Sequence, residues 1–253
     1  HTDPRQTLDQ SAMRRLQYLI IAITVGLNAL DGFDILAISF AGPGIAAEWE
    51  LGNAGLGYVL SMELIGMMLG SVFLGGVADR MGRRPTIMGC LMAMVIGMFM
   101  VTTTSSLAEL GFWRVITGLG IGGMLAALNA QAAEFSNNKN RGFCIATMAV
   151  GYPVGGVIGG LVVTQLMQVF DWRSIFYFGT AVSAAFIPIM YFVMPESVHW
   201  LARKQPKGAL DKINATMKRL GHAAIAQLPD IDEATRKVST SFLFSKLMIR
   251  TTI

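Results

Sequence analysis

The sequence predicts an all-α membrane protein organised around a six-helix bundle, and three observations lead to this fold class. Hydrophobic residues make up 53% of the 253 residues and charged residues only 14%, whereas ordinary soluble domains carry about 25% charged residues. Six long apolar runs each reach the ~20 residues that a membrane-spanning helix needs. Basic residues are concentrated in alternate connections between these runs, which is typical of multi-pass membrane proteins.

The first apolar run, residues 16–47, contains two carboxylates. Asp31 and Asp34 are the only charged residues in this run, and their spacing of three places both on one face of a helix. About 32 helical residues cover roughly 48 Å, more than a ~30 Å hydrocarbon core needs, so both are expected at membrane depth. A charge there costs ~2.5–3.5 kcal/mol and usually lines a polar pathway. A helix end that reaches water is the alternative interpretation.

Five further runs predict five more spanning helices. Glu63 interrupts the second run of the chain and Arg114 interrupts the fourth. Turn-forming or charged segments separate the runs, and the first of these predicted breaks is Gly42-Pro43-Gly44. The five runs are residues 53–78, 85–108, 110–133, 142–170 and 174–195.

The distribution of basic residues predicts the orientation in the membrane. When the N-terminus is placed inside, the inner segments hold all 20 lysine and arginine residues except Arg114 and Arg173, and this bias predicts a cytoplasmic N-terminus. Past Pro195, apolar residues recur at helical spacing and predict amphipathic helices. The predicted domains are a cytoplasmic segment (1–15), a six-helix transmembrane bundle (16–195), a cytoplasmic linker with amphipathic helices (196–240) and the truncated start of a seventh span (241–253).

Four charged residues are therefore expected within the bilayer. Counted along their helices, Asp31, Asp34, Glu63 and Arg114 lie at similar depths in the outer half of the membrane. Opposite charges are far less costly when they are buried together, so we expect a shared polar cavity among the first, second and fourth spans. Two plainer alternatives stay open, namely that Glu63 is a hydrogen-bonded packing residue and that Arg114 is an interfacial anchor.

Glycines are spaced along three of the predicted spans. Small residues let helices approach one another closely in lipid. The same surfaces suit helices that slide or rock, and the sequence does not separate these two interpretations. The glycines are Gly66 and Gly70, then Gly118, Gly120, Gly122 and Gly123, then Gly151, Gly155, Gly156, Gly159 and Gly160.

Other classes of function find little support in the sequence. The three histidines lie in polar segments and are interpreted as exposed surface residues. The two cysteines, Cys90 and Cys144, lie in apolar runs as small core residues. We therefore predict that the chain is not an enzyme, needs no cofactor or metal and binds no nucleic acid.

Four motifs, in order along the chain, resemble signatures of the major facilitator superfamily. The resemblance implies the N-terminal six-helix bundle of a twelve-span transporter, with a missing C-terminal six-helix half as its partner. The motifs are GGVADRMGRR at 75–84 (the loop between helices 2 and 3), RVITGLG at 114–120 (helix 4), Glu134 with Arg141-Gly142 (the loop between helices 4 and 5) and PESVHWL at 195–201 (after helix 6).

The tetrapeptide Asp31-Gly32-Phe33-Asp34 resembles the aromatic acid:proton symporter branch of that superfamily. This resemblance implies proton-coupled import of a small organic anion, such as benzoate, a hydroxybenzoate or cis,cis-muconate, across the lipid bilayer of the bacterial inner membrane. Asp31 and Asp34 would accept protons, beside Glu63. Arg114 would meet a substrate carboxylate, for which its planar fork is suited.

The loop signature implies a second group of residues that act at the inner gate. By resemblance, Asp79 would latch the cytoplasmic side in one conformation, within a charge network that breaks when the gate opens. Simple positive-inside anchoring explains the arginines equally well. The residues of this expected gating loop are Gly75, Asp79, Arg80, Gly82, Arg83, Arg84, Glu134, Arg141 and Glu196.

Two other functions stay open. The chain is alternatively a non-transporting half of a longer protein. It is alternatively a porter of sugars or other metabolites, because the Pro-Glu-Ser signature at 195–197 also occurs in sugar porters.

Overall fold

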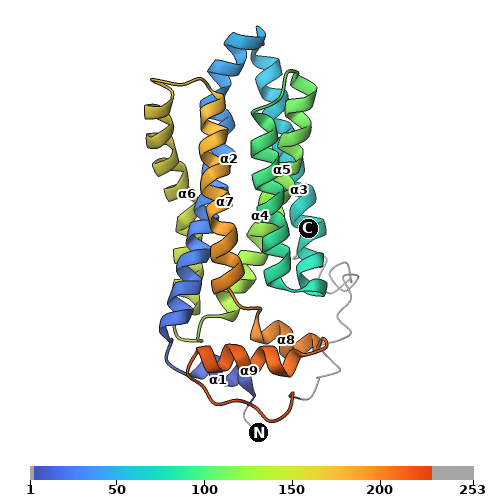
Figure 1. Ribbon diagram of the computed structural model, residues 1–253, viewed down its shortest axis with the longest axis vertical. Coiled ribbons are helices and arrows are strands. Elements are labelled where there is room, and N and C mark those ends of the chain that lie inside the picture. Colours follow the sequence, from blue (N-terminus) through green and yellow to red (C-terminus); the bar gives the residue numbers. More distant parts are fainter. Residues whose placement is uncertain (1–2, 230–253) are drawn as a thin grey trace, which may run out of the picture.

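A computed structural model describes residues 3–229, and all regular structure within them is helical (Figure 1). Six of these helices are long and apolar enough to cross a membrane, which confirms the predicted all-α membrane class. The predicted seventh span, 241–253, and the end of the predicted linker lie outside the described residues. The six long helices are α2 (Arg15–Trp49), α3 (Asn53–Met81), α4 (Arg83–Val101), α5 (Leu107–Glu134), α6 (Arg141–Leu166) and α7 (Arg173–Val193).

The predicted break at Gly42-Pro43-Gly44 is wrong, because α2 continues through it to Trp49. Pro43 is exposed on the helix surface, and Ser39, whose carbonyl loses its helical donor because proline has no N–H, is exposed as well. A Cβ atom on Gly44 would lie 2.9 Å from the Cβ of Trp172. This glycine therefore permits close packing against Trp172 and does not form a turn.

The long helices pack in two intimate pairs. α3 lies along α5, and α2 lies along α6, while α4 packs against both α5 and α7. Figure 1 shows these helices running side by side along the long axis of the molecule. Each pair is joined by a glycine seam, defined as the glycines whose added Cβ would lie within 3.0 Å of the partner helix's backbone: Gly66, Gly70, Gly118 and Gly122 between α3 and α5, and Gly32, Gly151 and Gly155 between α2 and α6.

The glycine seams predict a strong effect of single methyl groups. A Cβ on Gly122 would collide with the carbonyl oxygen of Met67, and one on Gly155 with that of Ala29. We expect Gly122→Ala and Gly155→Ala each to lower the stability by about 1–3 kcal/mol, because backbone cannot move aside as a flexible side chain can. Thermal unfolding of the purified, detergent-solubilised protein measures the change.

Gly89→Ala is the matched control for these two variants. Gly89 lies within α4, is exposed, and has no atom within 4 Å of an added Cβ. Alanine is the better helix former, so this variant is expected to unfold at the same or a slightly higher temperature. Equal unfolding temperatures for all three variants would contradict the close contacts described here.

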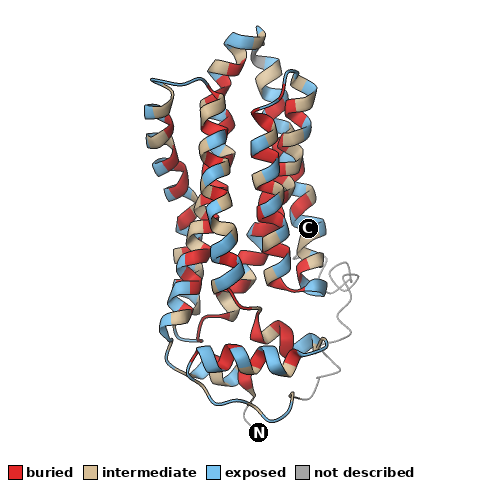
Figure 2. Cartoon of the chain, viewed as in Figure 1, coloured by how far each residue is buried: buried red, intermediate tan, exposed pale blue. Residues whose placement is uncertain are grey.

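Exposed residues, pale blue in Figure 2, lie along the outward faces of the long helices, and many of them are large and apolar. Phe73 on α3, Leu161 on α6 and Phe192 on α7 are each at least 66% exposed. Apolar surface of this extent is typical of a protein that contacts lipid or another protein. The chain is accordingly a multi-pass membrane protein.

Three short helices pack across one end of the bundle, and we call them the platform: α1 (Pro4–Gln10), α8 (Val198–Lys204) and α9 (Ala209–Arg219) (Figure 1). Asp3 caps α1 by accepting a hydrogen bond from the Arg5 N–H, and Ser197 caps α8 in the same way through the Trp200 N–H. Their apolar faces meet in one buried cluster that includes Leu8, Leu201 and Ile213. The predicted amphipathic helices after Pro195 are thus present.

Candidate functional site

Three of the four charged residues expected within the bilayer meet in the structure. Arg114 of α5 forms an ion pair with Asp34 of α2, with 3.0 Å between Nη1 and Oδ1, and a second ion pair with Glu63 of α3. Its Nη2 also donates a hydrogen bond of 3.1 Å to the Asp34 backbone carbonyl. The guanidinium lies 5.6 Å from the centre of the Phe176 ring. We call Asp31, Asp34, Glu63 and Arg114 the buried charge cluster.

Asp31 lies one helical turn from Asp34 and has a different environment. Both carboxyl oxygens of Asp31 are buried and have no hydrogen-bond partner among residues 3–229. Its charge is within electrostatic range of the Asp34 carboxylate. Asp31 therefore adds a buried acidic group that the Arg114 guanidinium does not neutralise directly.

The position of Asp31 follows from the seam between α2 and α6. A Cβ on Gly32 would collide with the Tyr152 carbonyl, so only glycine lets the two backbones approach this closely. Nearby, the Asn28 side-chain amide donates a 2.7 Å hydrogen bond to the Met148 carbonyl of α6. These contacts bury the Asp31–Asp34 turn between helices instead of against lipid.

The cluster is closed, which differs from the polar cavity that the sequence led us to expect. All four side chains belong to residues that are at most 2% exposed. The Arg114 guanidinium bridges α2, α3 and α5 by binding the carboxylates of Asp34 and Glu63, while Asp31 has no hydrogen-bond partner among residues 3–229. The burial of Arg114 also excludes the alternative that it is an interfacial anchor.

The α3–α4 connection forms a second polar network at the platform end. Arg83 links helices by ion pairs with Asp79, at 2.7 Å, and with Glu134 at the end of α5, at 3.3 Å. Gly82 makes the turn with a φ of +113°, a backbone conformation that favours glycine. We call Asp79, Gly82, Arg83, Glu134 and Glu196 the α3–α4 loop network.

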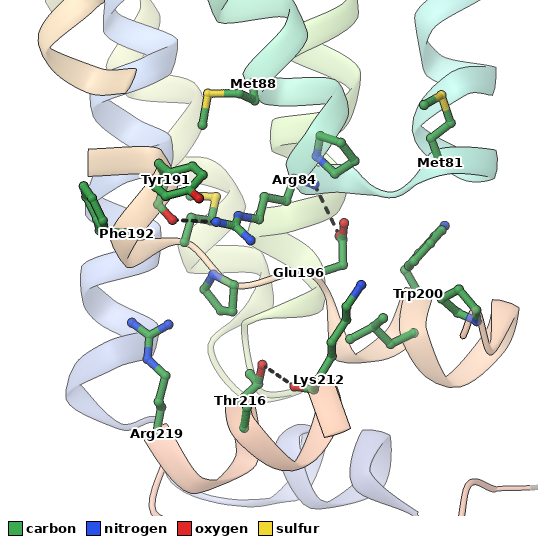
Figure 3. A pocket seen from close by; sticks show the side chains of 16 residues that line it. Met81, Arg84, Met88, Tyr191, Phe192, Glu196, Trp200, Lys212, Thr216 and Arg219 are labelled. Atoms are coloured by element: carbon green, nitrogen blue, oxygen red, sulfur yellow. Dashed lines mark hydrogen bonds between the residues drawn. The ribbon is translucent and has the colours of Figure 1, made fainter. Parts of the chain in front are cut away.

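Glu196 joins this network through backbone groups instead of through an arginine side chain. Its Oε1 accepts hydrogen bonds from the N–H groups of Arg83 (2.9 Å), Arg84 (3.3 Å) and Ser197 (2.9 Å). Figure 3 shows this carboxylate below the start of α4. Burial raises the pKa of Glu196, while the three N–H donors act in the opposite direction. A carboxylate at a helix N-terminus is also favoured by the helix dipole.

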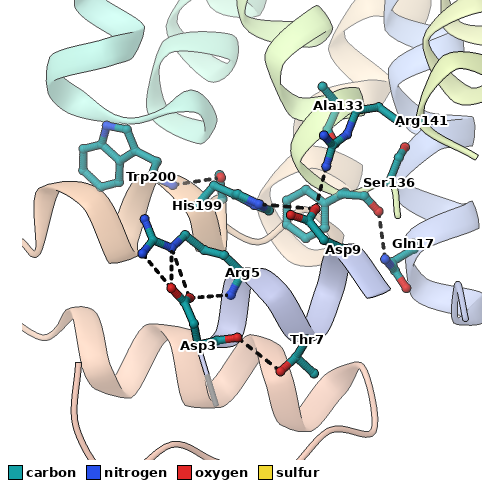
Figure 4. A network of polar contacts seen from close by, with 12 residues as sticks. Asp3, Arg5, Thr7, Asp9, Gln17, Ala133, Ser136, Arg141, His199 and Trp200 are labelled. Carbon is teal, nitrogen blue, oxygen red and sulfur yellow. Dashed lines mark hydrogen bonds and ion pairs between the residues drawn. The ribbon is translucent and has the colours of Figure 1, made fainter. Parts of the chain in front are cut away.

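Arg141 does not join the α3–α4 loop network, so the expectation that it would is wrong. Its Nη2 lies 2.5 Å from Oδ1 of Asp9 on α1, and its Nε donates to the Ala133 carbonyl. Figure 4 shows Arg141 and His199 both directed at Asp9. His199, 3.6 Å from that carboxylate, is half-buried instead of exposed, and its burial lowers its pKa.

The remaining members of the expected gating loop lie outside these ion pairs. Arg80 is exposed and forms no ion pair within residues 3–229. Gly75 lies inside α3, where an added Cβ would meet only the Ala126 Cβ at 3.8 Å, so close packing does not require glycine there. Arg84 donates a 2.5 Å hydrogen bond to the Tyr191 carbonyl of α7.

Sequence reasoning did not identify Asp9 or Phe176. Asp9 binds an arginine 132 positions away, and nothing in the local pattern of either residue indicates such a contact. Phe176 is one of several aromatic residues in an apolar run, and only the packing of α7 on the bundle places it beside Arg114. Among the described residues, no group of His, Cys, Asp and Glu is arranged to hold a metal ion.

Comparison with known proteins identifies a family and a set of relatives. A profile of the Major Facilitator Superfamily matches residues 24–249. The chain is 27% identical to a gallate transporter of Pseudomonas putida, over 87% of this chain and 48% of that protein. It is 26% identical to a 4-hydroxybenzoate transporter of Acinetobacter baylyi, over 99% of this chain and 56% of that protein.

A further relative and a solved structure extend the comparison. The chain is 29% identical to a cis,cis-muconate transport protein of Acinetobacter baylyi, over 78% of this chain and 47% of that protein. It thus spans about half the length of the curated relatives it matches. A partially occluded, inward-open structure of the xylose transporter from E. coli shares the fold, with a TM-score of 0.73 at 19% identity, over 83% of this chain and 54% of that one.

Proposed function

This chain belongs to the Major Facilitator Superfamily, and from that membership we propose that it forms the N-terminal half of a proton-coupled importer of a small organic anion. The proposed substrates are aromatic acids such as benzoate and hydroxybenzoate, or cis,cis-muconate. The names of the similar proteins, which transport gallate, 4-hydroxybenzoate and cis,cis-muconate, support this class of substrate.

The observation that carries the proposal is the buried charge cluster. The cluster holds one guanidinium and three buried carboxyl groups, and the guanidinium binds two of them. Ionisation of all three would leave an excess of negative charge in a medium of low dielectric, and such an excess is costly. Protons are the smallest cations that relieve it, so the cluster is suited to take up protons during a transport cycle.

Substrate binding follows from the same geometry. Arg114 can form paired hydrogen bonds with a carboxylate, and in the structure its Nη1 binds Asp34 and its Nη2 binds Glu63. We propose that protonation of the cluster weakens these ion pairs and frees Arg114 to bind the substrate carboxylate. Asp31, which has no hydrogen-bond partner within the described residues, is proposed to receive the coupling proton together with Asp34.

The rest of the transporter supplies the other wall of the substrate site. In transporters of this architecture, substrate binds near the midplane between two halves. We propose that a second six-helix half faces this chain, in the bacterial inner membrane, with the N-terminus and the platform in the cytoplasm. The placement of the basic residues at the platform end supports this orientation. The α3–α4 loop network is proposed to act there as part of the inner gate.

Uptake by membrane vesicles that contain the complete transporter tests the proposal. Labelled 4-hydroxybenzoate is expected to accumulate when the vesicle interior is made alkaline, and a protonophore is expected to reduce accumulation to background. Excess benzoate or muconate should compete, whereas xylose should not. Competition by xylose in place of aromatic acids would overturn the proposed substrate class and favour the sugar porter alternative.

A further inference from the structure

A cleft of about 600 Å³ opens where the bundle meets the platform. Its upper wall consists of the first turn of α4 and the last turn of α7, which are ends of membrane-spanning helices. Its lower wall is α9 of the platform. The cleft therefore lies at the level where a bilayer gives way to water, and neither the buried charge cluster nor the proposed substrate path includes it.

The cleft is positively charged. Arg84, Lys212 and Arg219 line it, and none of the three forms an ion pair within the described part of the chain. Among residues 3–229, the one carboxylate in the lining is that of Glu196, whose Oε1 already accepts three backbone hydrogen bonds. Figure 3 shows Lys212 and Arg219 directed from α9 toward the helix ends that carry Arg84 and Tyr191. The free charge of the cleft is thus cationic.

The two arginines are held in place by the spanning helix above them. Arg84 donates to the Tyr191 carbonyl, and Arg219 donates a 3.0 Å hydrogen bond to the Val193 carbonyl. These carbonyl groups belong to the last turn of α7, where backbone acceptors have no helical partner. Each guanidinium uses one donor for this contact, and an arginine side chain has five. Several donors on each arginine stay available to an anion.

An apolar stripe leads out of the cleft toward the middle of the bundle. Pro85, Gly89, Met92, Ile96 and Phe99 are all exposed on α4, and their spacing of three and four places them on one helix face. The stripe begins at Pro85 in the cleft wall and runs about 21 Å along the helix, more than half of a ~30 Å hydrocarbon core. Tyr191 and Phe192, 61% and 74% exposed, flank its lower end on α7.

From this juxtaposition of a cationic cleft and an apolar stripe, we infer that the cleft binds the headgroup of an anionic phospholipid whose acyl chain lies along α4. The phosphate accepts hydrogen bonds from Arg84, Lys212 and Arg219, and the exposed rings of α7 lie beside the glycerol and upper acyl region. Basic pockets at the membrane surface are suited to such headgroups. A free phosphate ion would fit the positive charge of the cleft, but nothing in it would contact the apolar stripe on α4.

Lipid binding to the complete transporter, purified in detergent, tests this inference. Native mass spectrometry compares phosphatidylglycerol with phosphatidylcholine of the same acyl chains. Replacing both α9 cations (Lys212→Gln with Arg219→Gln) is expected to reduce the affinity for phosphatidylglycerol about tenfold or more, while binding of phosphatidylcholine stays unchanged. The matched control, Lys204→Gln with Lys218→Gln, removes the same charge from exposed platform positions outside the cleft and is expected to have little effect.

Each other outcome contradicts the inference. An equal loss in both double variants would mean that phosphatidylglycerol responds only to the overall charge of the platform. Equal binding of the two lipids to the unaltered protein would mean that the cleft does not select an anionic headgroup. Displacement of phosphatidylglycerol by millimolar inorganic phosphate would assign the cleft to the free ion. Absence of bound phosphatidylglycerol would leave the cleft to a protein segment.

Discussion

Replacing Arg114 by methionine is expected to abolish uptake and to destabilise the folded protein. Methionine fills the space with an uncharged side chain of similar length, but it leaves the carboxylates of Asp34 and Glu63 buried without their cation. Removal of one partner of a buried ion pair costs about 3–5 kcal/mol. The unfolding temperature of the purified protein should fall clearly, and uptake of labelled 4-hydroxybenzoate should fall to background at equal protein level.

Two further variants separate charge from packing in this test. Arg173→Met removes a half-buried arginine whose partner, the carboxylate of Glu48, is exposed, and it is expected to cost about 1 kcal/mol, less than Arg114→Met. The triple variant Arg114→Met, Asp34→Asn, Glu63→Gln removes the unpaired charges together and should regain much of the stability without regaining uptake. If Arg114→Met alone keeps both the stability and the uptake of the unaltered protein, the buried charge cluster has no role in transport.

Asp31→Asn and Asp34→Asn are expected to eliminate proton-driven uptake with opposite effects on stability. Asparagine at position 31 removes a buried carboxylate that has no hydrogen-bond partner among the described residues, so the protein should be as stable or more stable. Asparagine at position 34 breaks the 3.0 Å ion pair with Arg114 and should lower the unfolding temperature. The measurements are uptake under an imposed pH gradient and thermal unfolding.

The exposed carboxylate of Glu50, just past the end of α2, provides the control as Glu50→Gln. This variant should transport and unfold as the unaltered protein does. Undiminished proton-driven uptake by both aspartate variants would end the proposal that these carboxyl groups carry the coupling protons. A loss of uptake with identical stability changes in the two variants would contradict the different environments of Asp31 and Asp34.

Much of the fold was predictable from the sequence because lipid imposes a simple requirement. A spanning helix must be long and apolar, so each long apolar run predicts one, and all six are present. Membership in a superfamily of transporters also confirms the interpretation that the chain is not an enzyme. The exception was the break predicted at Pro43. The helix α2 continues through this proline, which lies on an exposed face of the helix.

The charged sites were predictable in part, for a physical reason. A buried charge needs a partner of opposite sign at the same depth. Counting residues along each helix therefore predicted that Arg114 lies near Asp34 and Glu63. Arg141 lies at the platform end of the bundle. Many charged residues lie at this level, so depth along the helix does not predict which of them Arg141 binds. Its contact with Asp9 depends on how α1 packs beneath α5 and α6, and no periodic pattern encodes this packing.

The two glycine seams have a consequence for how the molecule changes shape. The first three long helices correspond to the last three in chain order: α2 to α5, α3 to α6 and α4 to α7. Under this correspondence the α3–α5 pair becomes the α6–α2 pair, and the α4–α7 pair becomes itself. This pairing agrees with the inverted three-helix repeats from which transporters of this architecture are built, although α4 packs more extensively on α5 than α7 does on α2. Because both interlocked seams join one repeat to the other at backbone distance, the repeats are clamped together. We therefore expect the bundle to rock as a single rigid body, with the sliding confined to its outer faces.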